Sequence, residues 1–314
     1  MINQLPVYLF TGFLEGGKTH IIQESMEDKR FNSGEKTLLI VCEEGVEEYE
    51  PSRFSGKNVY IKTVDDKELL SESLLSGWLR ETKSERVIIE YNGMWTLDAL
   101  YNSMPKKWVI YQEMMFADST TFENYNSNMR SLVVDKLKTA ELVIFNRFDN
   151  NIDRMALHKI VRAIQRNNVI IYEYTDGSTE QDTIIDPLPY DINADVLEIA
   201  DTDYAIWYRD MMEETEKYNG KVVKFTGLSA KDKKMDAAEF VTGRHVMTCC
   251  EDDVQYAGLI AICKDKCNVK TGDWLKITAT ISIEFNKAYR SKGPVLKVSE
   301  YILTSEPEQK VVTF

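Results

Sequence analysis

The chain has 314 residues and lacks any apolar run that approaches the roughly 20 residues needed to span a bilayer. It also lacks a basic leader with a cleavage site, since the N-terminus runs directly into an apolar segment. We therefore expect a cytoplasmic protein that does not itself span a membrane. Positive charge is scarce as well: 38 Lys and Arg stand against 51 Asp and Glu, which gives a formal net charge of -13. This charge disfavours a phosphate-backbone partner, so we expect no nucleic acid, while metal ions and basic protein surfaces remain compatible.

Cysteine is equally scarce, with five residues in the chain. Cys42 stands alone, and the other four crowd near the C-terminus: Cys249, Cys250, Cys263 and Cys267. In a reducing cytosol such a cluster more often binds a metal, reacts or is simply buried than forms disulfides. Internal repeats and low-complexity tracts are absent, and the 43% of hydrophobic residues supply a core of normal size.

The most informative segment that is present fits the pattern G-x-x-x-x-G-K-[ST]. An apolar run, residues 7–10, precedes it and reads as a buried strand, and residues 20–26 can follow it as a helix. A glycine-rich turn between a strand and a helix presents backbone N–H groups to an anion, its lysine reaches the β- and γ-phosphates, and its threonine hydroxyl binds Mg²⁺. The alternative is a chance match in an ordinary βα turn, which this context disfavours. The motif supplies the candidate nucleotide-binding residues Gly12, Glu15, Gly16, Gly17, Lys18 and Thr19.

The first part of the chain alternates strand-like and helix-like segments, the pattern of a mostly parallel α/β sheet with helices on both faces. Helical patterns lie between most of the strands, notably over 124–138 and 153–165. Ligands of such sheets bind beyond the C-terminal ends of the strands. The expected strands are 7–10, 37–41, 87–89, 109–117, 142–145 and 169–172.

The amino-acid composition changes after residue 175. Residues 176–189 are rich in Asp, Thr, Gly and Pro and read as a linker, and a short acidic helix follows around 204–218. Five short strands separated by turn residues then suggest a small barrel of the OB type. We therefore expect three parts: a P-loop domain over 1–176, a linker with a short helix over 177–218, and an OB-like β-barrel domain over 219–314. The expected barrel strands are 221–227, 239–249, 257–263, 274–283 and 295–303.

Two carboxylates follow strands of the expected sheet. Glu90 ends the third strand, where it can hold the Mg²⁺ shell through water, and Gly93 lets the backbone approach the γ-phosphate. Glu43 lies in an acidic loop after the second strand, where it could assist Mg²⁺ or orient water. The alternatives are a polar residue at a strand end for Glu90 and a solvated acidic loop for Glu43.

The tetrapeptide Asn146-Arg147-Phe148-Asp149 follows another expected strand and resembles the guanine-reading N-K-x-D motif. The Asp149 carboxylate could accept from the guanine N1–H and exocyclic amine, bonds that adenine cannot supply. Arg147 replaces the usual lysine and could still pack on the base. A turn is the alternative, because Asn and Asp both favour turns.

Four segments together resemble the CobW-type GTPases, the nucleotide-dependent metal chaperones (metallochaperones) related to the nickel-insertion and urease-maturation GTPases. The resemblance covers about the first half of the chain and implies GTP hydrolysis with Mg²⁺ and a role in metal delivery or homeostasis. Its segments are 5–19, Glu90-x-x-Gly93, 116–122 and 142–149.

The chain departs from that family at two points. The family usually carries a C-x-C-C metal motif before the strand that ends at Glu90, but no cysteine lies between Cys42 and Glu90. His20 stands where a second threonine is usual, and it could touch the α-phosphate or cap the helix.

The C-terminal part resembles an OB-like domain found in bacterial lipoprotein or cytosolic partners of a putative membrane permease, on the residues 203–208, 218–221 and 240–250. If the protein holds Zn²⁺ or another transition metal, the four C-terminal cysteines are the best ligand set, with His245 in reserve. This requires the strand that ends near Cys250 to lie beside the turn from Cys263 to Cys267. The alternative is that some of these cysteines are small buried hydrophobes.

The sequence therefore predicts a GTPase in which Lys18, Glu90 and Glu43 are catalytic, Thr19 and Glu90 hold Mg²⁺, and hydrolysis is slow without a partner. GTP is the expected ligand, and a metal-receiving client or a permease subunit the expected partner; a homodimer is left open. The rival prediction is a nucleotide-gated adaptor with little turnover, whose β domain docks a protein. An OB-fold nucleic-acid binder is disfavoured by the charge.

Overall fold

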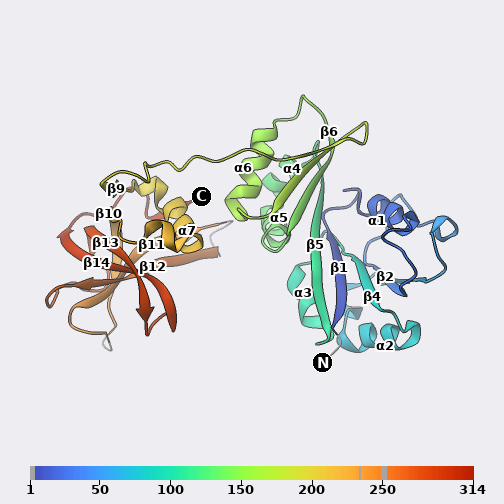
Figure 1. The fold of residues 1–314 in the computed structure, drawn as a ribbon, viewed down its shortest axis with the longest axis horizontal. Helices are drawn as coiled ribbons and strands as arrows, with labels where there is room; N and C mark the ends of the chain where they lie inside the picture. Colours follow the sequence, from blue (N-terminus) through green and yellow to red (C-terminus); the bar gives the residue numbers. More distant parts are fainter. Residues whose placement is uncertain (1–3, 233–234, 249–252) are drawn as a thin grey trace. The chain divides into compact units, whose positions relative to one another are not determined.

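The computed structural model describes residues 4–232, 235–248 and 253–314. The chain divides into two compact units, Met1–Ile184 and Ile185–Phe314, and Figure 1 traces both from the blue N-terminus to the red C-terminus. No helix within the described ranges is long and apolar enough to cross a membrane.

Within these ranges the first unit is built on an eight-stranded sheet in the order β3-β2-β4-β1-β5-β6-β7-β8. Neighbours from β3 through β7 pair in parallel, and β8 runs antiparallel to β7. Strands β2 and β4 are buried along their whole length, as a sheet covered on both faces requires. The strands are β1 (Leu5–Thr11), β2 (Thr37–Val41), β3 (Val59–Thr63), β4 (Arg86–Glu90), β5 (Trp108–Asp118), β6 (Leu142–Phe148), β7 (Val169–Tyr174) and β8 (Thr179–Gln181).

Helices cover both faces of this sheet. Ile22 and Met26 of α1 pack with Phe10 on one face, while the apolar sides of α2, α3, α5 and α6 pack on the other. Leu9 and Phe10 belong to opposite faces because side chains alternate along a strand. The expected α/β fold is confirmed. The helices are α1 (Lys18–Glu27), α2 (Glu72–Thr82), α3 (Leu97–Ser103), α4 (Phe122–Asn128), α5 (Arg130–Leu137) and α6 (Arg154–Ile164), with the short 3₁₀ turns η1 (Pro51–Arg53) and η2 (Lys67–Leu69).

The local assignments differ from the sequence in two places. Strand β3 was not among the expected strands, although it pairs along its whole length with β2. The single helix expected over 124–138 is two helices, because Met129 between α4 and α5 adopts φ -134° and ψ 41°, outside the helical region.

The second unit is a closed β-barrel. Its five strands follow one another around the ring in the order β11-β12-β14-β13-β10, and β10 pairs back onto β11. All pairs in the ring are antiparallel except β12 with β14. The expected small barrel is therefore confirmed. Its strands are β10 (Val222–Ala230), β11 (Glu239–Met247), β12 (Val254–Cys263), β13 (Trp274–Asn286) and β14 (Ser291–Leu303), extended by β9 (Val196–Glu198) and β15 (Val311–Thr313).

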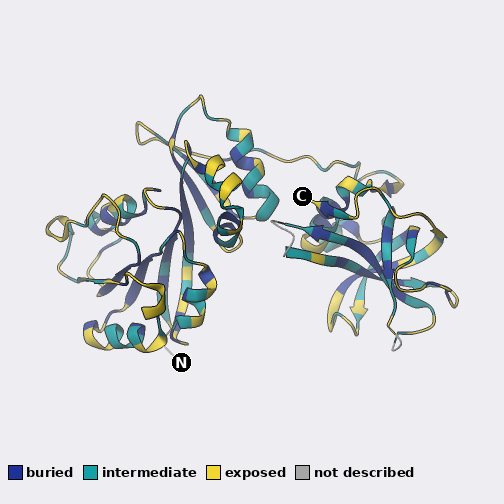
Figure 2. Cartoon of the chain, turned by 180° about the vertical axis from the view of Figure 1, so that it is seen from behind, coloured by how far each residue is buried: buried dark blue, intermediate teal, exposed yellow. Residues whose placement is uncertain are grey.

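The segment expected to be a linker is divided between the two units. Strand β8 extends the first sheet, while η3 (Asp201–Asp203), α7 (Tyr204–Glu213) and α8 (Thr215–Tyr218) belong to the second unit. Trp207 is fully buried in the same apolar core as the inward side chains of the barrel, which is why this segment folds with the strands. Figure 2 shows the inner strands of both units buried and residues 183–195, which connect the units, largely exposed.

Candidate functional site

The loop between β1 and α1 has the backbone of a phosphate-binding turn. Gly12 (φ 127°) and Gly17 (φ 87°) lie in the left-handed region that glycine tolerates. A Cβ atom on Gly12 would lie 2.0 Å from the carbonyl oxygen of Phe116, so a side chain there would push the loop away from β5. Glu15 also has a positive φ, 60°. These residues bend the chain so that α1 begins at Lys18, with its N-terminus beyond the end of β1.

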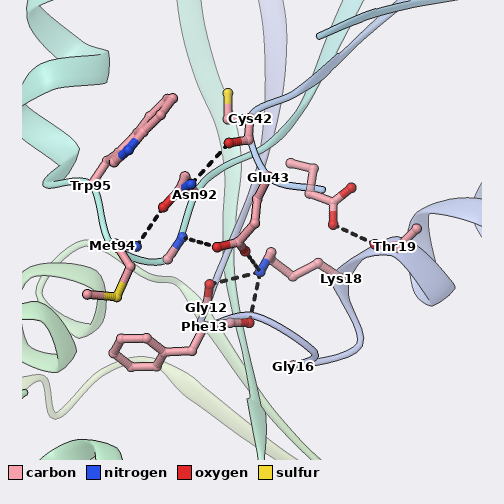
Figure 3. Close-up of polar contacts among 12 residues, drawn as sticks. Gly12, Phe13, Gly16, Lys18, Thr19, Cys42, Glu43, Asn92, Met94 and Trp95 are labelled. Atoms are coloured by element: carbon pink, nitrogen blue, oxygen red, sulfur yellow. Dashed lines mark hydrogen bonds and ion pairs between the residues drawn. The ribbon is translucent and has the colours of Figure 1, made fainter. Parts of the chain in front are cut away.

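Lys18 is buried and fastened to the loop. Its Nζ donates to the carbonyls of Gly12 and Phe13, both at 2.9 Å, and lies 2.8 Å from Oε2 of Glu43 (Figure 3). The other oxygen of Glu43, Oε1, accepts from the N–H of Gly93 at 3.3 Å. The ends of β1, β2 and β4 therefore meet around one ammonium group.

Glu90 lies beside this lysine at the end of β4 and accepts two hydroxyl hydrogen bonds. Thr19 donates to Oε1 at 2.7 Å, and Tyr49 donates to Oε2 at 2.5 Å. Burial raises the pKa of Glu90 above its ordinary value, while the two hydroxyls and Lys18 act in the opposite direction. Burial beside Glu90 raises the pKa of Tyr49 well above its usual range, so the phenol stays protonated and donates. Tyr49 could not be singled out from the sequence, because nothing local to it distinguishes its hydroxyl from that of other tyrosines.

These side chains surround a cavity of about 300 Å³. Four glutamates and two cationic side chains line it, so a polyphosphate enters only with further positive charge. Its lining residues are Leu14, Glu15, Gly17, Lys18, Thr19, Glu43, Gly45, Val46, Glu47, Glu90 and Arg147.

The donor set suits Mg²⁺, which prefers hydroxyl and carboxylate oxygens and commonly takes one or two carboxylates together with substrate phosphates. Thr19 and Glu90 supply such oxygens 2.7 Å apart. Burial and the charges of Glu90 and Glu43 raise the pKa of Cys42 to about 12, so this neighbouring thiol stays protonated. In the described part of the chain, no three His, Cys, Asp or Glu residues are grouped to hold a metal on their own.

Asn146 and Arg147 lie against the phosphate loop. The Nδ2 of Asn146 donates to the Gly16 carbonyl at 2.6 Å, and its buried Oδ1 has no partner among the residues that the structure describes. Arg147, at φ 50°, donates to the Glu15 carbonyl at 3.0 Å and pairs with Asp118 at 2.5 Å.

A second cavity, of about 380 Å³, adjoins Asn146 and Arg147 and extends to the turn between β7 and β8. Asp149 lines neither cavity: its Oδ1 accepts from the N–H of Asn151 at 2.6 Å in a local turn. His20 lines the second cavity and lies 3.4 Å from Glu24 on the next turn of α1. It does not cap the helix, because Gly17 holds the N-cap position and no side chain accepts a hydrogen bond there. The second cavity is lined by Gly17, His20, Ile21, Glu24, Glu47, Phe116, Asn146, Arg147, Glu173, Tyr174, Thr175 and Gly177.

The pairing of β11 with β12 bears on the proposed cluster of four cysteines. Cys249 and Cys250 lie outside the described residues. Strands β11 and β12 pair as an antiparallel hairpin, with Met247 opposite Val254. Cys263 ends β12, about 30 Å along the strand from that pair at roughly 3.3 Å per residue. The four-cysteine site requires the strand that ends near Cys250 to lie beside the turn at Cys263, whereas antiparallel pairing places Met247, at the end of β11, beside the start of β12.

Cys263 and Cys267 do lie near one another. Their backbone N–H groups bind consecutive carbonyls, those of Ala238 at 3.0 Å and Ala237 at 3.2 Å. The ammonium of Lys231 lies 3.4 Å from the sulfur of Cys267, where it competes with a metal cation. Burial and the neighbouring Cys267 raise the pKa of Cys263 to about 11. The raised pKa keeps the Cys263 thiol protonated near neutral pH, as expected of a structural cysteine.

Comparisons with known proteins give one family and several solved structures. A family model described as the DUF1980 C-terminal domain matches residues 174–312, which include the whole barrel. No curated protein matches the chain.

The solved structures that resemble the chain include a hydrogenase maturation factor HypB from Archaeoglobus fulgidus, at 14% identity and a TM-score of 0.42, covering 56% of this chain and 83% of that one. Another is a Zn(II)-bound YjiA GTPase from E. coli, at 14% identity and a TM-score of 0.42, covering 77% of this chain and 86% of that one. A Zn(II)-bound triple mutant of YjiA has 14% identity and a TM-score of 0.43 and covers 86% of this chain and 92% of that one. Similarity at this level identifies no ligand or activity for this chain.

Proposed function

We propose that the first unit binds GTP as its Mg²⁺ complex and hydrolyses the γ-phosphate. The observation that carries this proposal is the convergence of Lys18, Thr19 and Glu90 on one cavity at the C-terminal ends of β1 and β4. A coupling of the reaction to metal delivery or homeostasis rests on the resemblance in sequence alone.

Each residue has a definite role in this proposal. Lys18 exchanges its bond to Glu43 for the β- and γ-phosphate oxygens, and the loop N–H groups stabilise the charge that develops there. Thr19 offers its hydroxyl oxygen, and Glu90 accepts from water held around the cation. Mg²⁺ supplies the positive charge that neutralises the phosphates. Glu43, freed from Lys18, is close enough to the cavity to orient the attacking water.

Guanine specificity is proposed for the second cavity. Asn146 and Arg147 fasten its edge to the phosphate loop. Asp149 lines neither cavity while its carboxylate accepts from the N–H of Asn151, so in this proposal the carboxylate leaves that bond and turns to the guanine N1–H and amine. Adenine offers no such pair of donors at these positions.

One observation favours the rival proposal, a nucleotide-gated adaptor with little turnover. Among the described residues that line the first cavity, Arg147 is the one arginine. It already pairs with Asp118 and donates to the Glu15 carbonyl. No arginine is thus available to stabilise the transferring phosphoryl group, a contribution worth about 10³–10⁵ in rate. We therefore propose slow turnover without a partner, with the barrel as the docking module for a client or a permease subunit.

The experiment that tests the proposal compares Lys18→Ala with Lys29→Ala, an exposed lysine just beyond α1. We expect Mg²⁺-dependent GTP binding and phosphate release in the wild type and in Lys29→Ala, and neither in Lys18→Ala. Circular dichroism checks that all three chains are folded. Unchanged GTP affinity in Lys18→Ala would overturn the P-loop proposal.

The link to metals needs a separate measurement. Metal analysis of protein purified anaerobically with and without GTP should show a transition metal whose content depends on the nucleotide. A protein that contains no transition metal under either condition would contradict the link to metal delivery, but it would not contradict the proposed GTP hydrolysis.

A further inference from the structure

The chain that follows β2 is attached to the site at two points six residues apart. At the first, Glu43 contacts Lys18 at 2.8 Å. At the second, the hydroxyl of Tyr49 donates to Glu90 at 2.5 Å. Residues 44–48 between them are exposed and, within the described structure, make no hydrogen bond. We call residues 44–48 the strap, because Gly45, Val46 and Glu47 line the cavity over which it passes.

The two attachments differ in how firmly they are held. Immediately after Tyr49, the side chain of Gln23 on α1 binds both backbone groups of Glu50, accepting from its N–H at 3.0 Å and donating to its carbonyl at 3.3 Å. Arg53 pairs with Glu27 of α1 at 2.9 Å, and the N–H of Ser55 binds the carbonyl at the end of the same helix at 3.0 Å. Tyr49 therefore projects from chain that is fixed to α1.

The position of Tyr49 has a consequence for Glu90. A buried carboxylate with one hydrogen bond can rotate about its terminal torsion, which is broad for glutamate. Because Tyr49 occupies Oε2, Oε1 stays directed at the hydroxyl of Thr19. The proposed function assigns the hydroxyl oxygen of Thr19 to Mg²⁺ and the carboxylate of Glu90 to water around the cation, so Tyr49 fixes the distance between these two groups.

We propose that Tyr49 is a positioning residue that holds Glu90 toward Thr19, and that it is also the fixed end of the strap. The other end is released when a nucleotide takes Lys18 from Glu43. The inference rests on the proposed function for the ligand that releases the strap, whereas the fastening by Tyr49 is a property of the chain alone.

The first test concerns Mg²⁺. In Tyr49→Phe the ring is kept and the hydroxyl is lost. The control is Tyr60→Phe on β3, at a residue that is 37% exposed. We expect the Mg²⁺ concentration that half-saturates nucleotide binding to rise about tenfold in Tyr49→Phe, the effect of losing one hydrogen bond to a charged group. Nucleotide affinity measured in EDTA should be unchanged. An unaltered Mg²⁺ requirement would overturn the positioning role.

The second test uses the glutamates of the strap, Glu44, Glu47 and Glu48, as cleavage sites for a glutamate-specific protease. Without any nucleotide, Tyr49→Phe should be cut in the strap faster than the wild type and Tyr60→Phe. Gln23→Leu, which frees Glu50 from α1, should act in the same direction. In the wild type, Mg²⁺ with a non-hydrolysable GTP analogue should accelerate these cuts.

The outcomes separate the two proposals. If the wild type binds no nucleotide, the proposed function fails, while the nucleotide-free comparison still tests the fastening. If nucleotide binds but slows cleavage in the strap, the release is wrong. If neither Tyr49→Phe nor Gln23→Leu changes the nucleotide-free cleavage, the fixed end is wrong.

Discussion

At the scale of single residues, the site consists of hydrogen bonds and an ion pair around two charged groups, the ammonium of Lys18 and the carboxylate of Glu90. Lys18 is bonded to two carbonyls and to Glu43, and Glu90 to two hydroxyls, so each charge is satisfied within the protein. Buried charges persist only when they are paired in this way. Under the proposed function, phosphate and Mg²⁺ replace these partners, so we expect binding of either one to move the chain after β2.

Asp149 allows a test of base specificity. Asp149→Asn exchanges an acceptor for a donor, so GTP binding should weaken by about 10²-fold or more and xanthine nucleotides should gain. Asp98→Asn, an exposed change on α3, is the control. Competition binding with GTP, XTP and ATP decides the question, and an unchanged preference in Asp149→Asn would show that Asp149 remains in its turn with Asn151.

Cys263 allows a test of the metal-site alternative. Its pKa is raised to about 11, so its thiolate is scarce at neutral pH and increases as pH rises. Alkylation of this residue by iodoacetamide should thus be slow at pH 8 and rise about tenfold per pH unit up to its pKa. Peptide mapping by mass spectrometry isolates it from the other cysteines. Fast, pH-independent alkylation after treatment with a chelator would instead indicate a thiolate that had held a metal.

At the scale of secondary-structure elements, the sequence predicts what depends on local pattern. The strand, glycine loop and helix around Lys18 are encoded within about 20 residues, and the apolar runs of β2 and β4 have the continuous burial of a parallel sheet. Strand β3 was missed because its half-buried residues lie at the edge of that sheet, where the apolar pattern is weaker. Tyr49 was missed because its partner, Glu90, is 41 residues away.

The antiparallel pairing of β11 with β12 can be predicted from the sequence. Two strands joined by a short connection are antiparallel. The end of β11 must then lie beside the start of β12, which separates Met247 from Cys263. Nearness of the cysteines along the chain therefore does not by itself bring the end of β11 close to Cys263.

Helix α7 provides the prediction at this scale. Trp207 is fully buried in the barrel core, so Trp207→Ala should destabilise the second unit by about 3–5 kcal/mol. Met212→Ala, at a position 43% exposed on the same helix, is the control. In calorimetry one transition should fall by roughly 10 °C or more. Unchanged unfolding would mean that this segment is the linker expected from the sequence.

At the scale of the whole molecule, two units with separate cores are joined by exposed chain. The candidate nucleotide site lies entirely in the first unit, and the matched family model covers the second. The chain carries a net charge of -13, and four glutamates line this cavity, so under the proposed function a cation must accompany the polyphosphate.

The central claim, a guanine-nucleotide site that depends on Mg²⁺, is tested most directly by calorimetric titration of the full chain with GTP and with ATP, each in Mg²⁺ and in EDTA. The proposed function predicts one GTP per chain in Mg²⁺, much weaker binding in EDTA, and weaker binding of ATP than of GTP. Equal affinity for the two nucleotides would contradict the assignment of the base, and GTP binding that is as tight in EDTA would contradict the role of Thr19 and Glu90.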